Sequence, residues 1–444
     1  MTPPENTTDA VKAITTNTDF ELGSVPPQER RGWLAITMIW VTIGIDVSGT
    51  MLGLELASGM NLGPALAATV LGSVLLGLLA IGCSYIGART GLTTSMISRA
   101  VFGTIGGRLI AAMIVISSLG WFAVQTGFFA SYAQHTLQDA LGWSVPAWVL
   151  AALGGALMLL TAVLGYRAIQ KLSLWAVPLL LALLGLGTVL ALSRYGTSGL
   201  SEEVEATLGF GTAVSLVMSI FILGVVLTPD MARWAKTPGH AMASGFVGFF
   251  LGNSIIVVVA ILFTKLTGSD QILSIFIVSG LGVVALAVLT IAQWSTNTTN
   301  AYSASLSLAA ILPRVPRRVH ALVGGSIAIV AACFGFVDWF IPFISLMGTL
   351  LAPYGGVYVA SLFFRMRAGG DVMAGERQQV RWPSLLAWAA ACLVALATTD
   401  PTAGLGFGWF TLTTIPTLDG LLAGLLFQSA LSLTASRRHR EALA

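Results

Sequence analysis

Charged side chains are scarce in this chain. Only 9% of its 444 residues are charged, whereas 56% are hydrophobic. Soluble globular proteins carry about 25% charged residues, so the composition excludes that class. Because lipid offers no partner to a free backbone N–H or C=O group, long apolar segments of this kind are expected to be helical. The sequence therefore predicts an all-α integral membrane protein.

Cysteine is also scarce. Cys83, Cys333 and Cys392 are each alone in an apolar stretch, without the spacing of a disulfide framework or a metal site. No paired acid and base motif indicates an enzyme, and no repeated filter sequence indicates a channel. We expect no bound cofactor. Residues 1–28 contain no apolar core of a signal peptide.

What the chain does contain is a series of apolar segments long enough to cross a bilayer, which takes about 20 residues. The segment 272–312 is too long for one crossing, so we expect a break at 279–282 and a short surface helix over 272–278. Twelve membrane spans are predicted, at 33–57, 65–87, 108–138, 147–165, 172–192, 211–228, 241–264, 282–312, 319–336, 339–364, 382–398 and 418–434.

The basic residues predict the orientation. All of the 22 Lys and Arg residues except Arg194 and Lys265 fall in the tails or in loops on one side of the predicted spans. The positive-inside rule then places both termini in the cytoplasm of a multi-pass protein of the cell membrane. The segment 88–107 is expected to lie along the inner surface. The net charge of +3 is thus an orientation signal, and no nucleic-acid partner is expected.

The predicted organisation is a single transporter domain, 33–434, between cytoplasmic tails at 1–32 and 435–444. Polar residues and glycines interrupt the first span between Gly44 and Gly53, and the sixth weakens at Gly224 and stops at Thr228-Pro229-Asp230. Interrupted helices in matching positions indicate inverted repeats around a transport site. The predicted parts are a first repeat, a second repeat and two extra helices, at 33–192, 211–364 and 382–434.

The most unusual segment is Trp-Ser-Thr-Asn-Thr-Thr-Asn at 294–300, in which six polar side chains follow one another inside an apolar span. Such groups could be hydrogen-bonding contacts between helices. Six in a row favour instead a lined cavity at the middle of the membrane. Asn297 and Asn300 would supply amides, and Ser295 and Thr296 would supply hydroxyls.

Other spans add candidate site residues. Asp46 is the one acid at midplane depth, and it could hold a cation, accept a proton or bind a substrate N–H group. Trp121 and Gln125 are four residues apart and share a helix face, which suits a flat heterocycle that stacks on the indole and meets the amide at its edge. Asp230 and Arg233 are expected to form a salt bridge at the cytoplasmic edge.

Several motifs resemble one family in the same order along the chain. They are Val25-Pro26-Pro27-Gln28-Glu29-Arg30-Arg31-Gly32-Trp33, Tyr85-Ile86-Gly87-Ala88-Arg89-Thr90-Gly91, Gly120-Trp121-Phe122, Thr228-Pro229-Asp230 with Arg233-Trp234, Phe250-Leu251-Gly252-Asn253-Ser254 and the cluster at Trp294. The chain is similar to the nucleobase–cation symporters, which include cytosine permeases and the bacterial hydantoin transporter. The similarity runs from about residue 19 to residue 365.

That resemblance implies the leucine-transporter-type fold, with a five-plus-five inverted repeat and broken helices 1 and 6. It implies a substrate sandwiched between Trp121 and Phe221, with Gln125 and Asn297 at its edge; Ser48 and Asn300 are added as neighbouring candidates. Asp46 replaces an aromatic residue of the cytosine permeases. The implied sodium ligands are the carbonyls of Thr42, Ile45 and Ala292 and the hydroxyls of Ser295 and Thr296.

The sequence thus predicts a secondary transporter that imports a nucleobase with a cation, sodium being favoured, by alternating access. Two alternatives stay open at this stage. One is another planar heterocycle, such as hydantoin, allantoin or a thiamine-precursor pyrimidine, and the other is coupling to protons. The expected partners are the small-molecule substrate, a monovalent cation and the lipid bilayer, and the protein is expected to function as a monomer.

The first prediction concerns Asp46. If its carboxylate holds a cation, a proton or a substrate N–H group, Asp46→Asn should lower uptake and flatten its dependence on external pH. Initial uptake rates across a pH series in proteoliposomes measure both effects. Full transport with an unchanged pH profile would make Asp46 a structural residue.

Overall fold

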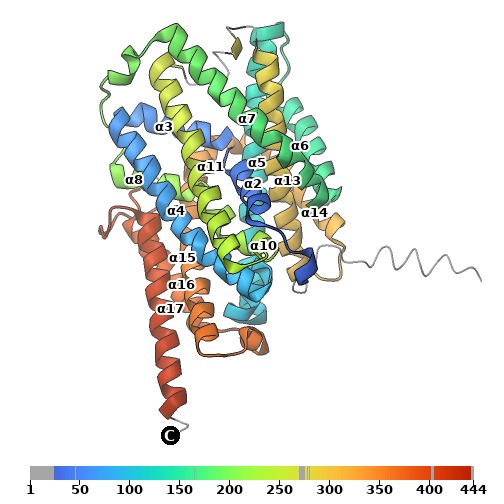
Figure 1. The fold of residues 1–444 in the computed structure, drawn as a ribbon, viewed down its shortest axis with the longest axis vertical. Helices are drawn as coiled ribbons and strands as arrows, with labels where there is room; N and C mark the ends of the chain where they lie inside the picture. The colour runs from blue at the N-terminus through green and yellow to red at the C-terminus, as the bar shows by residue number, and fades with distance from the viewer. Residues whose placement is uncertain are drawn as a thin grey trace, which may run out of the picture.

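The computed structural model describes residues 25–45, 47–164, 166–269, 276, 277, 279, 281–401 and 405–441. Regular secondary structure in these ranges is helical (Figure 1). The helices are α2 (Trp33–Gly44), α3 (Val47–Gly59), α4 (Leu62–Thr90), α5 (Thr94–Leu141), α6 (Ala147–Leu164), α7 (Tyr166–Tyr195), α8 (Phe210–Ser219), α9 (Ile222–Val226), α10 (Thr228–Ala232), α11 (Pro238–Thr267), α13 (Gly282–Ile311), α14 (Arg317–Cys333), α15 (Phe340–Arg367), α16 (Trp382–Thr398) and α17 (Pro416–Glu441).

Each apolar segment expected to span the membrane coincides with one or more of these helices. Helix α13 begins at Gly282, where the long segment 272–312 was expected to break. The surface helix expected over 272–278 falls largely outside the described residues. Helix α17 continues to Glu441, so the segment expected to be a C-terminal tail from residue 435 is helical up to that residue. By length and composition alone, five helices in the described ranges could cross a membrane.

Two interruptions divide the first and sixth spans. Helix α2 ends at Gly44 and α3 begins at Val47, with Ile45 between them at φ −98° and ψ 81°. In the sixth span, α8 ends at Ser219, and Phe221 leaves the helical conformation at φ −113° and ψ 13°. The expected weak point at Gly224 is therefore wrong, because that residue lies inside α9.

The expected stop at Thr228-Pro229-Asp230 directly follows an interruption, because α9 ends at Val226 and Leu227 leaves the helical conformation at φ −89° and ψ 0°. This segment begins α10, with the proline at the start of the helix. A proline in the first turn sacrifices no helical hydrogen bond, because the first N–H groups of any helix lack an intrahelical acceptor. Helix α10 thus begins at Thr228 after this second interruption of the sixth span, and Asp230 lies in its first turn.

The start of α5 lies inside the protein and not along the inner surface as expected. Its first residues are mostly buried as far as Phe102, and the hydroxyls of Ser98 and Tyr354 are 2.8 Å apart. Gly103 then bends the helix at φ +88°, where a side chain would also collide with the carbonyl oxygen of Gln379. Buried polar contacts of this kind outweigh the mild amphipathicity of the segment.

The segment before α2 is held against the end of α10. The Arg31 N–H group donates to the carbonyl of Trp234 at 2.6 Å, and the Lys236 N–H group donates to the carbonyl of Arg31 at 2.9 Å. These two bonds form an isolated parallel bridge between Arg31 and Ala235. The entry to the first span and the exit from the sixth are therefore joined through the backbone.

Helices α2 and α11 touch through their backbones at a pair of glycines. A methyl group added at Gly44 would lie 2.7 Å from the Cα atom of Gly252, and one added at Gly252 would lie 3.0 Å from that of Gly44. Close glycine contacts are common between membrane helices, because dispersion and backbone contacts replace the hydrophobic effect in lipid. This contact holds α11 directly behind the end of α2 that faces the break.

We expect Gly44→Ala to destabilise the protein by about 1–3 kcal/mol, the usual cost of overpacking. The decrease should appear as a lower melting temperature of the purified protein in detergent. Gly185→Ala is the matched control, because its added methyl group meets no atom within 4 Å. Equal melting temperatures for the two variants would contradict the close contact.

Candidate functional site

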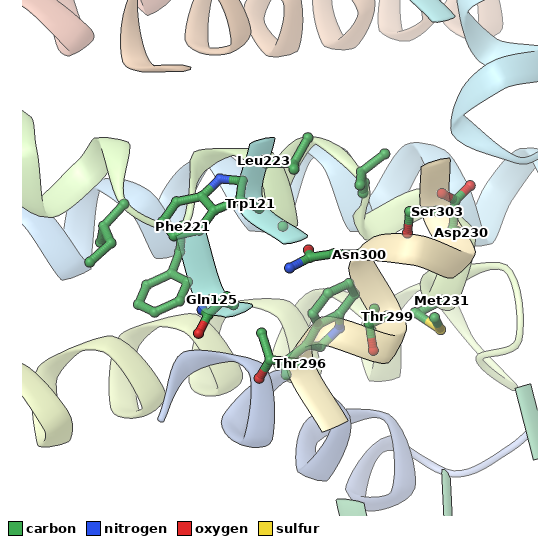
Figure 2. A pocket seen from close by; sticks show the side chains of 14 residues that line it. Trp121, Gln125, Phe221, Leu223, Asp230, Met231, Thr296, Thr299, Asn300 and Ser303 are labelled. Atoms are coloured by element: carbon green, nitrogen blue, oxygen red, sulfur yellow. The ribbon is translucent and has the colours of Figure 1, made fainter. Parts of the chain in front are cut away.

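A cavity lies between the broken spans and the facing helices α5 and α13 (Figure 2). The first span contributes one aromatic side chain, the sixth contributes residues from both sides of its break, and α5 and α13 contribute most of the polar groups. Residues that line the cavity include Trp40, Trp121, Gln125, Phe221, Gly224, Asp230, Met231, Thr296, Thr299, Asn300 and Ser303.

Aromatic side chains form the apolar part of the lining. Trp121 is only 4% exposed and Phe221 5%, and both were singled out from the sequence. The ring of Trp121 meets Phe343 edge to face at a centroid distance of 5.4 Å, and a similar contact with Phe340 spans 6.3 Å. Contacts of this geometry fix the plane of the indole, so the cavity offers a preset face to a flat ring.

One face of α13 supplies the polar lining. Thr296, Thr299, Asn300 and Ser303 follow the spacing i, i+3, i+4 and i+7, which places them on a single side of a helix, and all of them line the cavity. Figure 2 shows Thr296, Thr299 and Asn300 on helix α13, opposite Trp121 and Gln125. Ser303 had not been expected, although it lies one turn beyond Thr299 and continues the same stripe.

Asn297, expected at the edge of the substrate, lies on another face of α13 and is not among the residues that line the cavity. Its Nδ2 group is 3.0 Å from the hydroxyl of Thr126, 3.3 Å from the carbonyl of Phe122 and 3.2 Å from the sulfur of Met158. The neighbouring indole of Trp294 donates to Thr161 at 2.8 Å. These residues join α13 to α5 and α6, and this half of the polar cluster is a contact between helices.

The carboxamide of Gln125 lines the cavity and is held from behind by Gln293. The Nε2 group of Gln293 lies 2.6 Å from the main-chain carbonyl of Gln125 and 3.2 Å from its Oε1 atom. Gln293 is 2% exposed. Sequence reasoning missed Gln293, although it lies one residue before the polar cluster and three before Thr296 on the same helix.

Asp230 is a further residue that had not been expected at the cavity. Its carboxylate accepts a hydrogen bond from the N–H group of Thr94 at 2.7 Å and lines the cavity. Arg233 donates through Nε to the main-chain carbonyl of Asp230 at 3.1 Å, so the expected salt bridge at the membrane edge is replaced by a backbone contact. Trp40 also lines the cavity. In the sequence, nothing marked it as a site residue except its position one turn before Gly44.

The residues implied to hold sodium belong to the end of α2, to the residue after it and to α13, a helix in contact with α2. The last carbonyls of a helix have no intrahelical partner, and those of Thr42 and Ile45 belong to the end of α2 at Gly44. On α13, the hydroxyl of Thr296 is 3.5 Å from the carbonyl oxygen of Ala292, and Ser295 is 1% exposed. Neutral oxygen atoms of these kinds fit a hard cation, which they would hold without a formal charge.

Ser48, Asp46 and Thr42 are the remaining candidates from the sequence. Ser48 is fully buried in the first turn of α3 and is not among the residues that line the cavity. Asp46 lies between α2 and α3 in sequence but outside the described residues. The side chain of Thr42 is likewise not described, although the residue belongs to the last turn of α2.

Known proteins resemble the chain over most of its length. A family model described as a permease for cytosine/purines, uracil, thiamine and allantoin matches residues 24–417. The cytosine permease of Escherichia coli strain K12 is 30% identical over 374 residues, which cover 83% of this chain and 87% of the relative. The hydantoin permease of Microbacterium maritypicum is 22% identical, covering 83% and 82%.

Solved structures share the fold. Mhp1, described as a nucleobase-cation-symport-1 family transporter in a closed conformation with bromovinylhydantoin bound, superposes with a TM-score of 0.79 at 19% identity. The match covers 94% of this chain and 95% of Mhp1. A sodium-coupled sialic acid symporter superposes with a TM-score of 0.62 at 13% identity, covering 95% and 93%. The predicted leucine-transporter-type class of an all-α membrane protein is thus confirmed.

The family match covers well over half of the chain, and its members are permeases and not enzymes. The similarity read from the motifs at 25–33, 85–91 and 228–234 is therefore confirmed. This chain is a multi-pass membrane protein that belongs to the nucleobase–cation symporter family of permeases for cytosine and purines, uracil, thiamine and allantoin.

Proposed function

We propose that this protein imports a nucleobase, cytosine or a related purine or pyrimidine, by symport with sodium. It would work in the cell membrane as a monomer, with both termini in the cytoplasm, by alternating access. The observation that carries the proposal is the cavity in which Trp121 and Phe221 line one part and Gln125 and Asn300 supply amides. An aromatic heterocycle needs this combination, because its faces are apolar and its edge carries hydrogen-bonding groups.

The position of the cation residues supports coupling between the two ligands. Ala292, Ser295 and Thr296 belong to the same two turns of α13 as the first residues of the polar stripe. Thr296 also lines the cavity. If one position of α13 relative to the end of α2 suits both ligands, each ligand raises the affinity of the other by the same factor. Sodium entering down its gradient then favours uptake of the ring compound.

One observation favours a second candidate substrate. Asp230 brings a carboxylate to the cavity lining, and carboxylates accept N–H groups. Ring compounds rich in N–H groups, such as hydantoin and allantoin, would use that acceptor, and relatives of this chain include a hydantoin permease and an allantoin permease. A thiamine-precursor pyrimidine or coupling to protons are further alternatives within the same fold.

The substrate class can be tested with the purified protein by thermal shift, since a ligand that binds only the folded state stabilises it by mass action. Purines, pyrimidines, hydantoin and allantoin should be compared with and without sodium. We expect one of these classes of compound to raise the melting temperature of the protein, and we expect the increase to be larger with sodium. If no ring compound stabilises the protein under either condition, the proposed function is wrong.

Trp121 provides the matching variant test. Stacking of a base on an aromatic side chain contributes about 1–3 kcal/mol, so Trp121→Ala should weaken binding of the best ligand by about tenfold or more. Trp121→Phe retains an aromatic face and should lose less. Normal affinity in Trp121→Ala, measured by titration calorimetry, would contradict the stacking arrangement.

The cation residues are tested by removing both hydroxyls. Ser295→Ala combined with Thr296→Ala should raise the sodium concentration needed for half-maximal uptake by about tenfold, because contacts to a charged group contribute about 1.5–3 kcal/mol. Thr298→Ala is the control, since its hydroxyl bonds the carbonyl of Trp294 on the same helix. Unchanged sodium stimulation in the double variant would exclude this site.

A further inference from the structure

We propose that Asn253 is a positioning residue for the transport site, and that it maintains the break of the sixth span beside Phe221. The inference rests on the proposed function, because Phe221 is one of the two aromatic side chains assigned to the ring ligand. Asn253 follows Gly252 on α11 and does not line the cavity. It would act entirely through the backbone of the sixth span.

The break in the sixth span releases a main-chain carbonyl. Helix α8 ends at Ser219, and Phe221 has φ −113° and ψ 13°. In a continuous helix, the N–H group of Phe221 would donate to the carbonyl of Val217, four residues earlier. Among the main-chain bonds of the described residues, the last one that closes α8 runs from the N–H group of Ile220 to the carbonyl of Leu216. The carbonyl of Val217 is therefore the first that the break leaves without its helical donor.

Asn253 supplies a donor in place of the missing one. Its Nδ2 group lies 3.1 Å from the carbonyl oxygen of Val217 and 3.1 Å from the hydroxyl oxygen of Ser73 on α4. A carbonyl oxygen can only accept a hydrogen bond, so it requires the NH2 end of the amide. Asn253 is 0% exposed, and its Oδ1 atom has no hydrogen-bond partner among the described residues. An apolar residue would avoid the cost of that unpaired acceptor, so the donor group accounts for an amide at this position.

This bond determines where the ring of Phe221 lies. A main-chain carbonyl without a partner is strongly unfavourable inside a membrane. Without Asn253, the carbonyl of Val217 would favour straightening of the span until the N–H group of Phe221 reached it. With Asn253 bound to that carbonyl, straightening gives it no partner that it lacks. Phe221 then stays at the break, where its side chain lines the cavity (Figure 2).

The second interruption of the sixth span is stabilised in the same way. Leu227 leaves the helical conformation there, and the hydroxyl of Tyr358 on α15 donates to the carbonyl of Val226 at 3.2 Å. The hydroxyl of Thr228 donates to the carbonyl of Val225 at 2.7 Å. Side-chain donors at both interruptions indicate that this span requires them wherever its helix is broken.

The test measures the affinity of the purified protein for cytosine, hypoxanthine and hydantoin by titration calorimetry in saturating sodium. Asn253→Leu keeps the branched shape of the side chain but has no donor. We expect it to weaken binding of the best of these ligands by about three- to tenfold, the range for one hydrogen bond. Asn253→Ala removes the same donor and takes its place if the leucine variant does not fold. Ser73→Ala is the matched control, because it removes the other bond of the Asn253 amide and leaves Val217 capped, and it should bind with normal affinity.

A double-mutant cycle separates positioning from general stability. If Asn253 acts through Phe221, then Phe221→Ala already removes the side chain that Asn253 positions. Adding Asn253→Leu to Phe221→Ala should therefore lower the affinity further by no more than about twofold. A merely structural residue would give the same loss in both backgrounds, because its effect would not depend on the ring of Phe221.

The outcomes separate this inference from the proposed function. Normal affinity in the Asn253 variant, or an equal loss with and without the ring of Phe221, would overturn the role of Asn253 alone. If none of the three ring compounds binds the unmodified protein, the proposed substrate class fails, and the inference fails with it.

Discussion

The site depends on the close contact between Gly44 of α2 and Gly252 of α11. No side chain separates the two helices there, so α11 supports the end of α2 at the point where the backbone leaves the helix. A broken helix inside a membrane exposes carbonyl groups that lipid cannot satisfy. The break is stable only where protein surrounds it, and this contact supplies one wall. The carbonyls that the break releases are the ones assigned to the cation.

Helix α13 divides its polar residues between two tasks. Thr296, Asn300 and Ser303 face the cavity, while Trp294 and Asn297 bond to α5 and α6. Both interpretations of the polar cluster, helix contact and lined cavity, are therefore correct for different faces of one helix. The fixed face holds the helix in its rotational position, which keeps the other face directed at the cavity.

Much of the fold follows from the sequence, because apolar length and basic loops report directly on membrane spans. Trp121 and Gln125 were singled out because they share a helix face, and Phe221 because the family resemblance implies an aromatic residue at its position. Asn297 was misplaced because a polar residue in a membrane helix has the same sequence signature whether it faces a cavity or a neighbouring helix. Gln293 and Asp230 were missed, because their roles depend on partners more than 130 positions away in the chain.

The backbone bridge between Arg31 and Ala235 has a consequence for following the motion of the protein. Any displacement of the end of α10 is passed to the chain just before Trp33, because two hydrogen bonds at 2.6 and 2.9 Å connect them. A spectroscopic label on this entry segment would therefore report the movement of a helix that lines the cavity. This end of the sixth span can thus be observed from a segment that is not among the residues lining the cavity.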